Sequence, residues 1–309
     1  MNTTAPTPYT PLRPARSCTL PVRGLDYHLL RWGEPRVDQP LLVLAHGWMD
    51  VAASYQFLVD ALPPDYAIVA PDWRGFGATV VPQQIDHFLF ADYLLDLDYL
   101  LDQLSPQQPV DLVGHSMGGN IATQYAGLRP ERIRKLVNLE GFGLPATQAE
   151  QAPGRLRDWM QQVKAQRQGE KQLHSYPDQA SVAARLQKTN PRLDDAKALW
   201  LASQWAQPQA DGRWHIRAHA AHKVPSAHLY HVAEADAVLR RIQAPTLSIS
   251  ASDDSLAAFW GERYTQAEYL QRMTAIATLR HAVVQDAGHM LHHDQPAALA
   301  TLIDAFLQE

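Results

Sequence analysis

The chain has 309 residues, of which 46% are hydrophobic and 19% are charged, so it is long enough and apolar enough to bury a sizeable core. This composition excludes a disordered chain and a collagen, and the single cysteine, Cys18, excludes a disulfide scaffold. The formal net charge of -5 argues against nucleic acid or an anionic membrane surface as a partner.

The first segment along the chain, residues 1–16, is rich in proline and polar residues and has no apolar signal region, so we expect a mobile arm. No apolar stretch approaches the roughly 18 residues that a membrane span needs. Together with the lone thiol, these observations predict a cytoplasmic protein. Two β-rich runs follow the arm, at 18–22 and 25–32, and are expected to pair as an antiparallel edge.

From Leu41 the chain alternates short apolar runs with helical stretches, which predicts a mostly parallel, doubly wound α/β sheet flanked by helices. Continuous apolar runs bounded by Gly or Pro are typical of strands buried on both faces. One clear helix is expected over 90–104, where apolar residues recur at steps of three and four. The predicted strands are 41–45, 66–70, 110–114, 135–139, 246–250 and 282–286.

The alternation breaks at about Phe142 and resumes after about Arg240. Between these points the pattern is helical, over 154–166, 181–188 and 194–206, and this segment holds half of the 8 Trp and six of the 14 His. We therefore expect an inserted α-helical cap over 142–240, with the core domain formed by 1–141 and 241–309.

The strongest chemical signal is the pattern G-x-S-x-G at 114–118, because it follows a predicted strand and opens the helical run 117–128. A nucleophile at such a place must protrude from a tight turn, so its neighbours must be small. The N–H groups of the following helix can then face a negatively charged oxygen. The pattern predicts that Ser116 is a nucleophile.

With this motif the chain resembles the α/β-hydrolase fold family, in which GHSMGG would be the nucleophile elbow. Three further landmarks stand in the family's order. The sequence HGW at 46–48 resembles the oxyanion loop, PDWRGFG at 71–77 resembles the D-x-R-G-x-G turn, and AGHMLHHDQP at 287–296 resembles the late histidine loop. The resemblance runs from about Leu41 to the end, interrupted by the cap, and implies a serine hydrolase without metal or organic cofactor.

The resemblance also implies roles for individual residues. Ser116 would be the nucleophile, His289 its base, and an acidic residue between them in the chain would hold the imidazole. The family pattern places this acid at Asp254. Asp253 and Glu140, which directly follows the strand 135–139, are the alternatives.

The backbone N–H groups of Met117 and Trp48 would form the oxyanion hole. The Trp48 ring and His115 are candidate substrate contacts, although the Trp48 ring is as well explained as a packed loop side chain. Asp72, in the turn after the second core strand, is expected to satisfy local N–H groups.

Two other histidine patterns compete with this interpretation. His289, His292 and His293 resemble a metal-binding cluster, but with His289 as a base the other two are expected to pack or cap the next helix, so we expect no metal. The spacing from His289 to Asp294 matches the H-x(4)-D pattern of acyltransferases, which we treat as incidental.

Three functions remain open at this point. The first is hydrolysis of an ester, thioester, lactone or amide through an acyl-enzyme, so the expected partner is a small molecule with an acyl group. The second is hydrolysis of a carbon–carbon bond in a diketone- or dienone-type compound, and the third is a catalytically silent ligand-binding member of the fold. Epoxide hydrolases and haloalkane dehalogenases are disfavoured, because they carry Asp where this chain has Ser116. The oligomeric state is not predicted.

Overall fold

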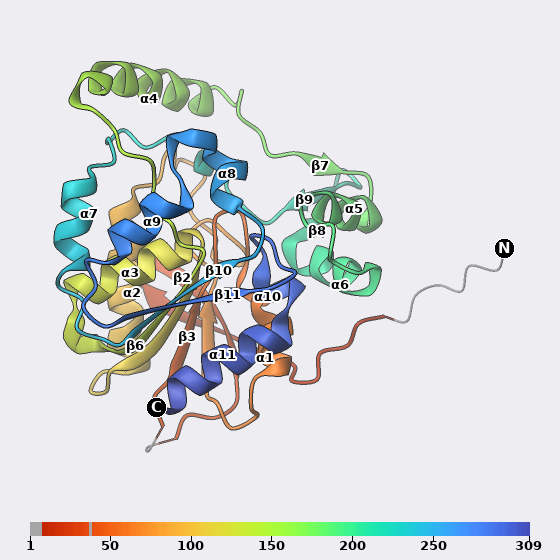
Figure 1. Ribbon diagram of the computed structural model, residues 1–309. Helices are drawn as coiled ribbons and strands as arrows, with labels where there is room; N and C mark the ends of the chain where they lie inside the picture. Colours follow the sequence, from red (N-terminus) through yellow and green to blue (C-terminus); the bar gives the residue numbers. More distant parts are fainter. Residues whose placement is uncertain (1–7, 37–38) are drawn as a thin grey trace.

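The computed structural model describes residues 8–36 and 39–309, and a central eight-stranded sheet organises them (Figure 1). The strand order is β1-β2-β4-β3-β5-β6-β10-β11. The strands are β1 (Arg16–Val22), β2 (Leu25–Trp32), β3 (Leu42–Ala45), β4 (Ile68–Pro71), β5 (Val110–His115), β6 (Ile133–Leu139), β10 (Thr246–Ala251) and β11 (Leu279–Val284).

The register of this sheet confirms the predicted doubly wound architecture. Strands β3, β4, β5, β6, β10 and β11 run parallel to their neighbours among these six. Strands β1 and β2 pair antiparallel, and β2 also pairs antiparallel with β4, so the expected antiparallel edge is present. The central strands β3, β4 and β5 are buried at every position, which explains their continuous apolar sequences.

Helices cover both faces of the sheet. One face packs against α2 (Phe90–Leu104) and α3 (Met117–Leu128), through a core that includes Leu97, Leu112 and Ile121. The opposite face packs against α1 (Gln56–Ala61) and α11 (Pro296–Gln308), through a second core. The other core elements are η1 (Ala52–Tyr55), η2 (Pro130–Arg132), α8 (Ser255–Trp260), η5 (Gly261–Arg263), α9 (Gln266–Met273) and α10 (Leu291–Asp294).

The inserted segment between β6 and β10 is mixed in structure. It contains η3 (Ala149–Gln151), α4 (Ala152–Arg167), α5 (Gln179–Thr189), α6 (Asp195–Trp205), η4 (Ala220–Lys223) and α7 (Val232–Leu239). It also contains a three-stranded sheet of β7 (Ser175–Tyr176), β9 (Trp214–Ile216) and β8 (Ala206–Pro208), which was not expected because strands of two or three residues show no period. Helices α5 and α6 pack on a third core, while α4 has no buried residue and lies at the top of Figure 1.

Helix α7, which we expected in the cap, packs on the core helix α3. A side chain at Gly127 of α3 would come within 2.2 Å of the Val238 carbonyl oxygen of α7. Because the two backbones approach this closely, α7 covers the sheet domain rather than the cap helices.

The expected mobile arm is anchored over its described part. Asp60 of α1 accepts hydrogen bonds from the Tyr9 hydroxyl at 2.5 Å, from Leu12 N at 3.1 Å and from Arg13 N at 3.0 Å. The described part of the predicted arm is thus bonded to α1, and residues 1–7 lie outside the described residues. No helix in the described ranges is both long enough and apolar enough to cross a bilayer.

Candidate active site

Ser116 lies in the tight turn between β5 and α3, with a φ of 52° and a ψ of -117°. This backbone conformation is strained for a residue with a side chain. The turn closes because its neighbours are glycines. A Cβ on Gly114 would lie 2.3 Å from the Gly118 carbonyl oxygen, and a Cβ on Gly118 would lie 2.0 Å from the Ala45 carbonyl oxygen. The glycines therefore allow the turn to present the serine at the carboxyl edge of the sheet.

A hydrogen-bonded chain of three side chains is centred on His289. Its Nε2 lies 3.0 Å from Ser116 Oγ, and its Nδ1 lies 3.2 Å from Glu140 Oε2. The loop between β11 and α10 carries His289, and the turns after β5 and β6 carry the other two residues. With the proton on Nδ1 donated to the carboxylate, Nε2 is free to accept the hydroxyl proton of Ser116.

Glu140 is held firmly in this chain. It follows β6 directly, with a φ of 55°, and only 2% of the residue is exposed. Its Oε1 accepts a hydrogen bond of 2.7 Å from Ala251 N at the end of β10. Each carboxylate oxygen therefore has its own donor, one from the backbone and one from the imidazole.

The structure does not bring Asp254 or Asp253 to His289, so the first choice of acid from the sequence requires correction. Asp254 is exposed, and its Oδ1 caps α8 by accepting from Ala257 N at 2.8 Å. Asp253 forms an exposed ion pair with Arg192, at 2.7 Å. The family pattern failed because the carboxylates after β10 turn into the start of α8, while the alternative, Glu140, enters from the neighbouring strand.

The loop that follows β3 passes beside Ser116, as expected for an oxyanion loop. A Cβ on Gly47 would lie 3.2 Å from Ser116 Cβ, so the two backbones are in contact. His46 fixes this loop: its Nε2 accepts from Trp73 N at 3.0 Å and its Nδ1 donates to Gly47 O at 2.8 Å. Burial lowers the pKa of His46 to about 4, so the ring is neutral.

Trp48 has an exposed fraction of 53%, and its indole N–H donates to the His222 carbonyl oxygen at 3.3 Å. This bond links the loop after β3 to the inserted segment. The Trp48 ring is therefore held at its N–H by the inserted segment, while about half of its surface is open to solvent.

His115 is not available to a substrate, contrary to our expectation. Only 2% of it is exposed, and burial lowers its pKa well below the usual value. Its Nε2 lies 2.7 Å from the His289 carbonyl oxygen, a bond in which the neutral ring donates. His115 thus supports the histidine loop from beneath rather than lining the surface.

Two aromatic rings that the sequence did not point to, those of Phe259 and Phe142, flank His289. The Phe259 ring lies edge-on with its centroid 4.9 Å from that of His289, and Phe142 lies 6.3 Å away. Phe259 is 53% exposed. No signal in the sequence marks them, because their positions depend on where α8 and the turn after β6 meet.

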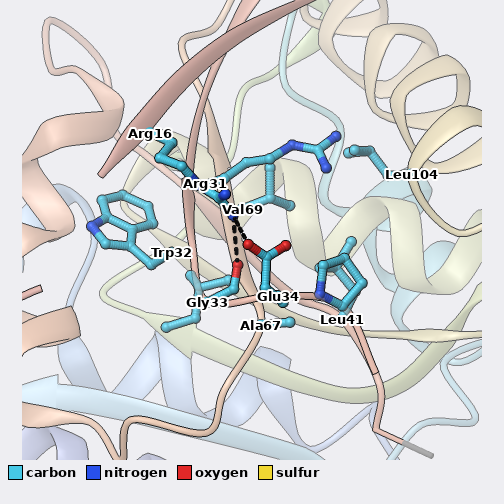
Figure 2. Close-up of a pocket in the computed structure, with 11 residues that line it drawn as sticks. Arg16, Arg31, Trp32, Gly33, Glu34, Leu41, Ala67, Val69 and Leu104 are labelled. Atoms are coloured by element: carbon cyan, nitrogen blue, oxygen red, sulfur yellow. Dashed lines mark hydrogen bonds and ion pairs between the residues drawn. The ribbon is translucent and has the colours of Figure 1, made fainter. Parts of the chain in front are cut away.

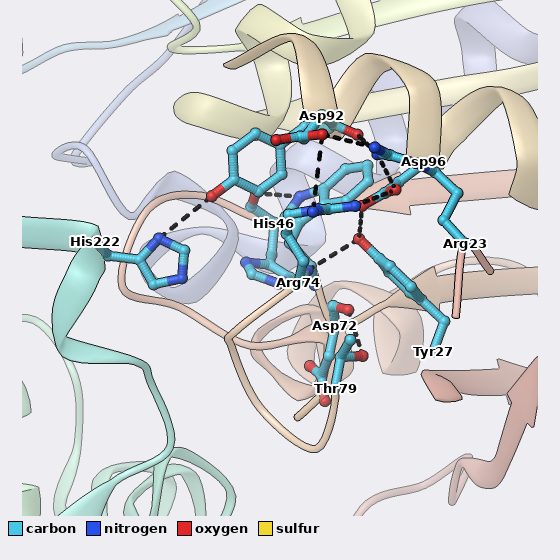
Figure 3. Close-up of polar contacts among 11 residues, drawn as sticks. Arg23, Tyr27, His46, Asp72, Arg74, Thr79, Asp92, Asp96 and His222 are labelled. Carbon is cyan, nitrogen blue, oxygen red and sulfur yellow. Dashed lines mark hydrogen bonds and ion pairs between the residues drawn. The ribbon is translucent and has the colours of Figure 1, made fainter. Parts of the chain in front are cut away.

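The D-x-R-G-x-G turn is a structural support, as expected for Asp72. Its carboxylate accepts from Ala52 N at 2.7 Å and from Ala78 N at 2.8 Å, and pairs with His28 at 2.7 Å. The adjacent Arg74 forms a buried pair with Asp96 of α2. Figure 3 shows this pair, with Tyr27 and Arg23 bonded to the same Asp96 carboxylate.

A small pocket elsewhere in the molecule is a poor candidate for catalysis (Figure 2). It lies at the amino ends of β3 and β4, where the side chain of Arg16 pairs with Glu34 at 2.5 Å. Ser116 and His289 lie at the carboxyl edge of the same parallel sheet, which is where ligands bind in open α/β folds.

His289, His292 and His293, whose pattern resembles a metal-binding cluster but which we expected to bind no metal, form separate contacts. His293 Nε2 bonds to Ser54 Oγ at 2.6 Å, and His292 Nε2 lies 3.3 Å from the same hydroxyl. A different set of ligand atoms comes together instead. Asp50, His115 and His292 are all buried, and each offers one ligand atom within 4.8 Å of the others.

Comparison with known proteins identifies the family of this chain. Residues 40–296 match the sequence profile of the alpha/beta hydrolase fold. A serine hydrolase-like protein of Danio rerio is 25% identical over 305 residues, covering 96% of this chain and 89% of that protein. Epoxide hydrolase 4 of Homo sapiens is 32% identical, but over 114 residues that cover 37% of this chain and 31% of that protein.

Among solved structures, a thioesterase domain from the curacin biosynthetic pathway superposes with a TM-score of 0.80 and 26% identity, covering 94% of this chain and 99% of that one. The E-2-(acetamidomethylene)succinate hydrolase structure, at 21% identity and a TM-score of 0.72, shares the fold. The profile spans most of the chain and the fold agrees with it. The chain therefore belongs to the α/β-hydrolase fold family.

Proposed function

We propose that this protein is a serine hydrolase that cleaves an acyl substrate, an ester or a thioester in the first place, through an acyl-enzyme on Ser116. The observation that carries the proposal is the hydrogen-bonded chain from Ser116 through His289 to Glu140, with distances of 3.0 Å and 3.2 Å. Its order is that of a nucleophile, a base and an acid that orients the base.

The proposed reaction begins when His289 Nε2 takes the proton of Ser116 as Oγ bonds to the acyl carbon. The backbone N–H groups of Met117 and Trp48 face the oxygen that becomes negative. The imidazolium, stabilised by the Glu140 carboxylate, then gives its proton to the leaving oxygen or sulfur. Water, deprotonated by the same Nε2, attacks the acyl-enzyme and releases the acid and the free serine.

The preference for esters and thioesters over the other acyl compounds has one support. The similar thioesterase domain covers nearly the whole chain at 26% identity, whereas the match to epoxide hydrolase 4 covers 37% of it. Ser116, rather than an aspartate, at the nucleophile position also argues against epoxide opening. Lactones, amides and carbon–carbon bonds stay as alternative substrates for the same three residues.

Labelling with a fluorophosphonate probe tests the nucleophile. Wild-type protein should become labelled, and Ser116→Ala should not. Equal labelling of both would remove Ser116 from the proposal. A panel of nitrophenyl esters, acyl thioesters and coloured ring-cleavage products then identifies the substrate class, and turnover of the ring-cleavage products alone would favour carbon–carbon hydrolysis.

A silent, ligand-binding protein is the remaining alternative from the sequence. It predicts that wild-type protein binds a small acyl compound without releasing product. Labelling by the probe together with turnover of any ester would exclude it.

A further inference from the structure

The buried cell formed by Asp50, His115 and His292 lies directly beneath the proposed catalytic loop. We call this cluster of three side chains the cell, and the polar atoms that matter in it are Asp50 Oδ2, His115 Nδ1 and His292 Nδ1. All three atoms are buried without a hydrogen-bond partner among the described residues. The exposed fractions of the three residues are 7%, 2% and 0%. Leaving three buried polar atoms without hydrogen bonds costs free energy, so a ligand that binds all three atoms would stabilise the fold.

The outer atoms of the same three side chains are already bonded. His115 Nε2 pairs with the His289 carbonyl oxygen at 2.7 Å, and His292 Nε2 lies 3.3 Å from Ser54 Oγ. Asp50 Oδ1 accepts from Val51 N at 2.9 Å. A ligating histidine usually donates its second N–H to a carbonyl or another oxygen, which fixes the tautomer and the ring. With the ring proton on Nε2 in each histidine, Nδ1 carries the free electron pair that can bind a metal.

We propose that this cell is a binding site for one divalent first-row transition metal ion, with Zn²⁺ as the best fit. Two imidazole nitrogens and one carboxylate oxygen are a ligand set that such ions accept. Bonds of about 2.1 Å at a tetrahedral centre require ligand atoms about 3.4 Å apart. Each of the three side chains offers one ligand atom, and these ligand atoms lie within 4.8 Å of one another, so metal binding would draw them together by at most about 1.4 Å.

The consequence for the molecule is structural. A metal on His115 would clamp the loop after β3, the end of β5 and the start of α10 to one point, and His115 in turn holds the His289 backbone. The ion has no place in the proposed acyl-transfer steps, because the cell lies in the interior and His115, one of its walls, is 2% exposed. The proposal is thus independent of the hydrolase function.

Metal binding to the full-length, tag-free protein tests this site. After chelator dialysis, wild-type protein is titrated with Zn²⁺ and with Co²⁺, and bound metal, cobalt absorption and thermal stability are measured. We expect one tightly bound equivalent per chain, a visible cobalt band and a higher Tm. Asp50→Asn and His292→Gln should lose that equivalent and the Tm response.

Three further variants serve as controls. His293→Gln changes a neighbouring buried histidine outside the cell and should keep the equivalent. Ser54→Ala keeps all three ligands and should weaken binding about 10- to 100-fold, because it removes an outer hydrogen bond. Ser116→Ala should bind metal like the wild type, whatever its activity. If wild-type protein binds no equivalent, the cell does not hold a metal; if Asp50→Asn and His292→Gln bind as the wild type does, the metal lies elsewhere in the molecule. Either result overturns the proposal.

Discussion

Replacing Glu140 with glutamine tests the central assignment of this site with a change of one atom. In the wild type, Oε1 accepts from Ala251 N at 2.7 Å and Oε2 faces His289 Nδ1 at 3.2 Å. A glutamine amide has one acceptor and one donor group, so it cannot serve both N–H groups. If its oxygen stays on Ala251 N, its NH₂ donates to Nδ1 and forces the proton onto Nε2. His289 is then in the wrong tautomer to accept the Ser116 proton.

The opposite orientation of the amide is also costly. It turns the NH₂ toward Ala251 N–H, which leaves a buried donor unpaired at a cost of about 1–3 kcal/mol. Losing the charged acceptor for the imidazolium removes about 1.5–3 kcal/mol more. The sum, about 2.5–6 kcal/mol, corresponds to a fall in kcat of about 10²- to 10⁴-fold. The upper end matches the effect of the equivalent change in a serine protease triad.

The matched control is Asp254→Asn, the same chemical change at the acid that the sequence favoured. Asn caps a helix about as well as Asp, so kcat should stay within about two-fold of the wild type. Steady-state hydrolysis of an activated ester, with circular dichroism to verify folding, measures both. A Glu140→Gln variant within about ten-fold of the wild type, beside a strongly impaired Asp254→Asn, would refute this reasoning.

The remaining predictions concern stability and substrate. Gly118→Ala should abolish native folding, since its Cβ would lie 2.0 Å from a carbonyl oxygen. Gly154→Ala, whose Cβ would point into open space in α4, should raise the free energy of unfolding in urea by up to about 1 kcal/mol. Burial lowers the pKa of His222 to about 3, so the folded state binds fewer protons than the unfolded state, and stability is lost as pH falls below 6.5. At pH 5 the share of His222 in this loss is about 2 kcal/mol, so His222→Gln should reduce the pH dependence of stability by that amount in urea unfolding. Phe259→Ala should lower kcat/KM roughly two- to twelve-fold, and an unchanged value would remove the ring from the site.

Local patterns in the sequence determined most of the fold. Continuous apolar runs predicted β3, β4, β5, β6 and β10, which are mostly buried, and the helix 90–104 has the predicted bounds. The predicted run 282–286 overlaps only the second half of β11 (Leu279–Val284), an edge strand with one buried residue. The sequence also predicted the glycines beside Ser116, because a tight strand-to-helix turn has no room for their side chains. The strands of the small sheet in the inserted segment are too short to carry a period, so they were missed.

The tertiary structure determined which carboxylate contacts His289 and which polar side chains meet in the interior. Glu140 and Asp254 both follow strands that end at the carboxyl edge, so the sequence offers both, and the reach of each side chain selects Glu140. His115 and His292 are 177 positions apart, yet β5 and α10 bring their rings to 4.5 Å between centroids. Distances between strand ends are fixed by sheet order and register, which single-sequence patterns do not encode.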